Sequence, residues 1–126
     1  MNLLLDTHAY LWWLSDSAAL GKRARATIAD PETLVFVSAA SIWEASVKSR
    51  LGRLDLKKDA DLVAEIAGNE FEELAISARH ARQAAALPPH HRDPFDRMLI
   101  AQATMEELRV VTRDPVFARY GVATLW

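Results

Sequence analysis

NLLLDTHAYLWWL, residues 2–14, joins a short apolar run to a segment whose apolar residues recur every three to four positions. The run at 2–5 is typical of a buried strand, and the pattern at 9–14 is typical of a helix. The polar residues Asp6, Thr7 and His8 stand between the two. A strand that ends in polar residues and leads directly into a helix is the building unit of parallel α/β folds.

The same unit recurs along the chain, which shows no internal repeat and no glycine/serine linker. Apolar runs predict strands at 2–5, 33–37 and 109–112, with weaker candidates at 71–76 and 122–126. Helical patterns occupy residues 9–14, 19–29, 40–51, 59–69, 77–87 and 94–107. Because strands alternate with helices, we predict an α/β fold, a single domain over residues 1–126 with a central parallel sheet covered on both faces.

The composition is that of a soluble globular protein, with 51% hydrophobic and 25% charged residues among 126. The chain has no cysteine, no pattern of a signal peptide and no apolar run near the ~20 residues of a membrane span, so we expect a cytoplasmic protein with no membrane partner. A net charge of −2 argues against a broad nonspecific coat on nucleic acid. Local basic patches remain open, although such runs are more often solvated faces; the candidates are Lys22, Arg23, Arg25, Lys48, Arg50, Arg53, Lys57 and Lys58.

The segment HRDPFDRMLI, residues 91–100, places two carboxylates three positions apart just before an apolar helical pattern. Local structure alone could explain both, because Asp93 before Pro94 reads as a helix N-cap and Asp96 falls in the first turn. Residues elsewhere in the chain must therefore decide whether these acids also serve a site.

Polar residues collect where the predicted strands end, which is the edge at which parallel α/β sheets bind ligands. Asp6 follows the first strand, Ser38 and Ser41 follow the second, and Thr112, Arg113 and Asp114 follow a third. Glu44 lies on the helix after the second strand, beside an apolar stripe formed by Ala40, Trp43, Val47 and Leu51. We expect Glu44 to be half sheltered and Trp43 to lie in the core, with an i,i+4 pair between Glu44 and Lys48 as the structural alternative.

Several carboxylates at one edge repel one another, so the pattern favours a divalent cation with oxygen ligands, Mg²⁺ or Mn²⁺. The histidines lack a zinc spacing, and His90 and His91 are predicted to lie on the surface. Carboxylate-held Mg²⁺ is suited to the hydrolysis of phosphodiesters, whereas no glycine-rich phosphate loop supports an NTPase. Hydrolysis of nucleic acid is the reaction class that follows.

Four motifs in order, LLLDTHAYLWWL, VSAASIWEASVK, HRDPFDRMLIAQA and VTRDPVF, resemble the PIN-domain ribonucleases, specifically the VapC-type toxins of bacterial toxin–antitoxin pairs. The resemblance covers essentially the whole chain. It implies an α/β/α sandwich and a Mg²⁺-dependent endoribonuclease that cuts RNA, forms a homodimer and is held inactive by a cognate antitoxin. An apolar surface around Leu11, Trp12 and residues 51–56 would serve either the homodimer or the antitoxin.

Carried over by residue, the resemblance makes Asp6, Glu44, Asp96 and Asp114 the catalytic, metal-binding acids. Asp93 is an additional acid that caps a helix and is a further candidate ligand, and Thr112 matches a hydroxyl residue near the site. Arg97 and Arg113 are candidates for phosphate contacts, although arginines beside carboxylates are more often their ion-pair partners.

Two other classes of function remain. A phosphoacceptor signalling domain has a similar size and sheet, but it needs an acidic pair after the first strand and a late lysine, where this chain has Thr7, His8 and Arg113. A noncatalytic protein-binding domain on the same fold would carry the acids without bringing them together.

Overall fold

Five short parallel strands form the centre of the molecule. The computed structural model describes residues 1–56 and 60–126. The strands are β1 (Asn2–Leu5), β2 (Leu34–Ser38), β3 (Glu72–Leu74), β4 (Arg109–Val111) and β5 (Thr124–Leu125). They lie in the order β3-β2-β1-β4-β5, and every neighbouring pair is parallel. All five predicted strands and the parallel sheet are therefore confirmed.

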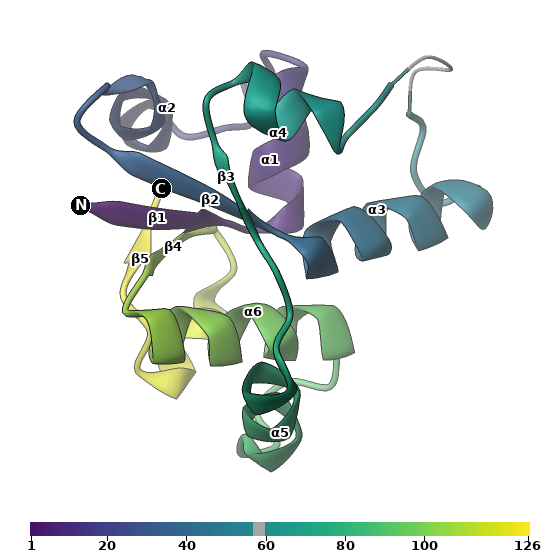
Figure 1. Cartoon of the computed structure of the whole chain (residues 1–126), viewed down its shortest axis with the longest axis vertical. Helices are drawn as coiled ribbons and strands as arrows, with labels where there is room; N and C mark the ends of the chain where they lie inside the picture. The colour runs from purple at the N-terminus through teal and green to yellow at the C-terminus, as the bar shows by residue number, and fades with distance from the viewer. Residues whose placement is uncertain (57–59) are drawn as a thin grey trace.

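The connections between the strands are helical: α1 (Thr7–Leu14), α2 (Lys22–Ala29), α3 (Ala39–Arg50), α4 (Ala64–Gly68), α5 (Ala78–Ala86), α6 (Pro94–Glu106) and the 3₁₀ helix η1 (Pro115–Tyr120). In Figure 1, α1, α2 and α4 lie on one side of the sheet, α5 and α6 lie on the other, and α3 extends beyond the end of β2. This arrangement confirms the α/β/α sandwich. Residue 59 of the predicted helix at 59–69 lies outside the described residues.

The hydrophobic core is divided by the sheet into two halves. Successive side chains of a strand point to opposite faces, so Leu3 and Leu5 pack with α1 and α2 while Leu4 packs against Leu99 and Ile100 of α6. All five side chains are fully buried. Burying a leucine or isoleucine stabilises the fold by about 1.5–3 kcal/mol. The continuous apolar run of β1 therefore anchors both layers and fixes where Asp6 emerges from the sheet.

Helix α3 differs from the sequence prediction. Trp43 is 60% exposed and Leu51 is 62% exposed, so the expected apolar stripe is buried only at Ala40, and Trp43 is not a core residue. The buried residues of α3 are Ala40, Ser41, Glu44 and Ala45. Small side chains on the buried face let α3 approach α1 and α6, and the resulting burial of Glu44, at 3% exposure, exceeds the half shelter that we expected. Hydropathy alone missed this because the buried face of α3 meets polar groups.

None of the helices in the described residues combines the length and the apolar character needed to cross a bilayer. The longest of them, α6, has 13 residues, against the ~20 of a membrane span. The expected cytoplasmic location stays a prediction.

Candidate active site

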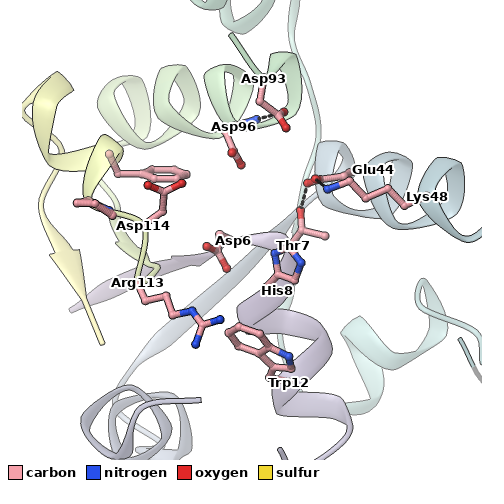
Figure 2. A pocket seen from close by; sticks show the side chains of 12 residues that line it. Asp6, Thr7, His8, Trp12, Glu44, Lys48, Asp93, Asp96, Arg113 and Asp114 are labelled. Carbon is pink, nitrogen blue, oxygen red and sulfur yellow. Dashed lines mark hydrogen bonds and ion pairs between the residues drawn. The ribbon is translucent and has the colours of Figure 1, made fainter. Parts of the chain in front are cut away.

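A cavity of about 460 Å³ opens at the carboxyl end of the sheet, between the starts of α1, α6 and η1 and the middle of α3 (Figure 2). All five predicted carboxylates line it, and they come from separate parts of the chain. The lining residues are Asp6, Thr7, His8, Trp12, Glu44, Lys48, Asp93, Asp96, Arg113, Asp114, Pro115 and Phe117. The structure thus brings together the acids that the sequence placed at strand ends, on a helix and at a helix start.

Three of these acids also cap helices. Oδ1 of Asp6 accepts a hydrogen bond from the amide of Ala9 at 2.8 Å, and Oδ1 of Asp114 accepts one from Val116 at 3.0 Å. Oδ1 of Asp93 accepts hydrogen bonds from the amides of Phe95 and Asp96 in the first turn of α6. Capping and pocket lining therefore occur together, and the caps hold the three carboxylates in place without long flexible side chains. The second carboxylate oxygen of Asp93 and of Asp114, Oδ2, makes no hydrogen bond within the described residues and is available to water or to a cation.

Asp96 is paired with a histidine that the sequence analysis assigned to the surface. Nε2 of His91 lies 2.7 Å from Oδ2 of Asp96, and the His91 side chain is only 23% exposed, so the surface assignment was wrong for His91, whereas His90 is exposed. The pKa of Asp96 is raised to about 6, mainly by burial and in part by the charges of Asp93 and Glu44, while the hydrogen bond with His91 opposes the rise. In the sequence, only the five-residue spacing between His91 and Asp96 could have suggested this contact, and such a spacing in a loop predicts no particular pairing.

Thr112 is a buried hydroxyl residue between Asp6 and Asp114. It is 4% exposed, and its Oγ1 accepts a hydrogen bond from the amide of Asp114 at 3.1 Å. Burial raises the pKa of Asp6, while hydrogen bonding with Thr112 and with the Ala9 amide opposes that rise. The role of Thr112 beside the site stays a prediction.

Both oxygens of Glu44 are engaged by neighbouring side chains. Oε1 accepts from Thr7 Oγ1 at 2.5 Å, and Oε2 accepts from Lys48 Nζ at 2.5 Å (Figure 2). The hydrogen bond with Glu44 raises the pKa of Lys48, so this ammonium stays charged. The i,i+4 pair that we left open is therefore present, and it lies inside the acidic pocket rather than on an exposed face. Lys48 places one positive charge among five carboxylates.

The two predicted arginines lie in different surroundings. The guanidinium of Arg113 stands 4.6 Å from the ring centre of Trp12 and lines the cavity. Arg97 does not line it: its guanidinium donates to four main-chain carbonyl oxygens at 2.9–3.1 Å. Those carbonyls belong to Ala84, Leu87, Pro88 and His91. Arg97 therefore holds the loop that carries His91, whereas Arg113 remains available to a phosphate.

The donor atoms suit a hard divalent cation. One ligand atom each from His91, Asp96 and Asp114 lie within 4.8 Å of one another, and Asp6 lines the same cavity. Carboxylate oxygens are the ligands that Mg²⁺ and Mn²⁺ prefer, and a cation there would relieve the repulsion that contributes to the raised pKa of Asp96. Both oxygens of Glu44 already accept a hydrogen bond, from Thr7 and Lys48, whereas Oδ2 of Asp114 accepts none within the described residues.

A protein-family model described as PIN domain matches residues 3–123 of this chain. No curated protein matches.

Several solved structures have a similar fold. The structure of VapBC2 from Rickettsia felis, bound to a DNA fragment from their promoter, matches with a TM-score of 0.72 and 14% identity, over 99% of this chain and 98% of that one. FitAcB from Neisseria gonorrhoeae matches with a TM-score of 0.58 and 19% identity, over 98% and 96%. A toxin–antitoxin complex from Klebsiella pneumoniae matches with a TM-score of 0.57 and 19% identity, over 89% and 86%. At these identities the likeness is one of fold.

Proposed function

Because this chain belongs to the PIN domain family, we propose that its acidic pocket is the active site of a metal-dependent endoribonuclease. The observation that carries the proposal is the convergence of five carboxylates in one cavity at the carboxyl end of the sheet. Repelling acids gathered from distant parts of the chain have a chemical use as a cation site, whereas helix capping needs none of them to meet. Mg²⁺ is the proposed cofactor, and Mn²⁺ should substitute for it.

Each group in the pocket has a distinct proposed task. Asp6, Asp96 and Asp114 hold the cation, with Asp93 beside them. A bound divalent cation polarises a phosphoryl oxygen and makes water a better nucleophile. Arg113, at the rim of the cavity, attracts the RNA phosphate and is held in place by its contact with Trp12.

Glu44 acts through its partners. Thr7 and Lys48 fix its carboxylate at the wall of the cavity, so the Glu44–Lys48 pair sets the charge of that wall. The pair is 3% exposed on the Glu44 side, and a buried carboxylate of this kind is stable only while its partner remains. We therefore propose that Lys48 holds the Glu44 carboxylate in place when no cation is bound.

The biological role that fits this site is that of a VapC-type toxin, inhibited by an antitoxin and acting as a homodimer. The toxin–antitoxin assemblies among the structures of similar fold support it. Of the predicted docking surface, Leu11, Trp12, Leu54 and Leu56 pack partly against the core. Leu51 remains 62% exposed and is the apolar side chain that this surface offers most openly.

The test is cleavage of labelled RNA by the purified protein with Mg²⁺, Mn²⁺, Ca²⁺ or a chelator. We expect cleavage with Mg²⁺ and Mn²⁺, weak or no cleavage with Ca²⁺, and none with the chelator. Asp6→Asn should reduce the rate by a hundredfold or more, since one oxygen ligand is lost. Asp93→Asn is the matched control and should be milder, because asparagine also caps a helix.

Three results would count against the proposal, each against a different part of it. Near-normal cleavage by Asp6→Asn would remove Asp6 from the site. A stable acyl phosphate after incubation with acetyl phosphate, together with intact RNA in every metal, would favour a phosphoacceptor domain. Absence of Mg²⁺ binding in calorimetry would favour the noncatalytic alternative.

A further inference from the structure

Trp43 is the feature that the proposed nuclease site does not account for. Its side chain is 60% exposed, whereas Trp12, Trp13 and Trp126 pack partly against the core. The Trp43 ring stands edge-on to the ring of Phe95, with 4.9 Å between their centres. An exposed indole held by a second aromatic ring leaves one large flat surface open to solvent, which a protein that needed it only for packing would bury.

Beside Trp43 lies a second cavity of about 300 Å³ between α3, α5 and α6. Its apolar walls include Trp43, Phe95, Ile76 and Met98, and its charged lining residues are Arg92 and Arg97. No acidic side chain of the described residues lines it. Arg97 is engaged with four main-chain carbonyls, whereas Arg92 is exposed. The hollow thus offers an aromatic wall and a positive charge, in contrast to the acidic cavity.

The hollow and the acidic cavity share two helices. On α3, Glu44 lines the acidic cavity and its neighbour Trp43 lines the hollow. On α6, Asp96 lines the acidic cavity and its neighbour Phe95 lines the hollow. Because sequence neighbours on both helices line the two cavities, the cavities are adjacent and a single strand of RNA can extend from one to the other.

We propose that the Trp43 hollow binds a base of single-stranded RNA that flanks the bond cut in the acidic cavity. The inference rests on the proposed function. Bases of unpaired RNA stack on exposed aromatic side chains with little sequence preference, and an arginine at the rim suits the neighbouring phosphate. A peptide or a second copy of this chain would explain the apolar walls. Neither explains the exposed guanidinium of Arg92, which precedes Asp93 of the proposed phosphodiester site.

The test separates contacts to bases from contacts to phosphates. Fluorescence anisotropy measures the binding of an oligoadenylate dodecamer and of an abasic dodecamer with the same backbone, in Ca²⁺. We expect the wild-type protein to prefer the base-bearing strand, and Trp43→Ala to weaken that binding by about tenfold while leaving the abasic strand unchanged. Trp43→Phe should recover part of the loss. Val63→Ala removes another exposed apolar side chain, one that lines neither cavity, and should change neither.

Each contrary outcome identifies what has failed. Equal affinity of the wild-type protein and Trp43→Ala for the base-bearing strand, with both folded by circular dichroism, overturns the inference. If RNA cleavage persists in that case, the proposed nuclease stands and only the base site falls. A shift of Trp43→Ala from dimer to monomer in sedimentation, without any loss of base-dependent binding, would assign the hollow to an interface between copies. Loss of abasic binding as well would mean that Trp43 supports the fold of the cavity instead of contacting a base.

Discussion

Replacing Asp96 by asparagine should stabilise the metal-free protein. Burial raises the pKa of Asp96 from its ordinary value of 3.8 to about 6, so at neutral pH Asp96 is ionised, but its ionisation costs more free energy in the folded state than in the unfolded chain. These two pKa values differ by roughly two pH units, and at about 1.4 kcal/mol per unit ionised Asp96 lowers the free energy of unfolding by about 3 kcal/mol. Asparagine carries no charge, and its side-chain oxygen can still accept a hydrogen bond from His91.

The sign of the pH dependence follows from proton binding. Between pH 4 and 6 the folded state keeps the Asp96 proton while the unfolded chain has lost it, so stability falls as pH rises through that window and is level above it. Asp96→Asn should therefore gain about 1–3 kcal/mol at pH 7.5, which is about 4–12 °C in the melting temperature of a domain of this size. At pH 4.5 the gain should shrink to about 1 kcal/mol or less.

Urea unfolding in a chelator, at both pH values, measures this difference. Asp93→Asn is the matched control on the same helical turn and should change stability by less, since asparagine keeps the cap. Adding Mg²⁺ should then stabilise the wild-type protein more than Asp96→Asn, because the variant has lost a ligand oxygen. An equal gain at the two pH values, or a loss at pH 7.5, would refute the reasoning, because neither follows from removing a buried charge.

Two further substitutions test the scaffold around the site. Arg97→Ala removes four hydrogen bonds to the loop that carries His91 and should lower the free energy of unfolding by about 2–4 kcal/mol. Arg97→Lys should recover little of this stability, because an ammonium lacks the planar fork of a guanidinium. Full recovery by lysine would contradict this role. Gly21→Ala would place a Cβ 2.7 Å from the main chain of Trp126 and should cost about 1–3 kcal/mol with a change in tryptophan fluorescence, whereas Gly68→Ala, with open space around it, should cost nothing; equal effects of the two in thermal unfolding would rule out the close contact.

The sequence predicted the strands and the acidic edge because both follow from local rules. β1 is buried on both faces, so it reads as a continuous apolar run, and Asp6 must then emerge at its carboxyl end. Asp114 is placed by the same rule after β4. These positions need only the strand direction and the parallel topology, which the alternation of strands and helices already indicates.

The remaining features depend on how distant elements pack. His91 contacts Asp96 while Arg97 holds the preceding loop against α6 by hydrogen bonds, and no local sequence pattern predicts that contact. Trp43 was expected in the core because hydropathy ranks it above Glu44, yet the packing of α3 against α1 and α6 reverses their burial. Periodicity predicts which face of a helix is apolar, but in α3 the buried face carries Glu44, a carboxylate of the proposed site.

The same carboxylates that would hold a cation weaken the fold when none is bound. Burial raises the pKa values of Asp6 and Asp96, so ionising either carboxyl costs more in the folded state than in the unfolded chain. The cavity offsets part of that cost, because hydrogen bonds with Thr112 and His91 lower the pKa values of Asp6 and Asp96, respectively. If the pocket binds a divalent cation as proposed, the cation would offset more of this cost, and its binding would therefore stabilise the fold.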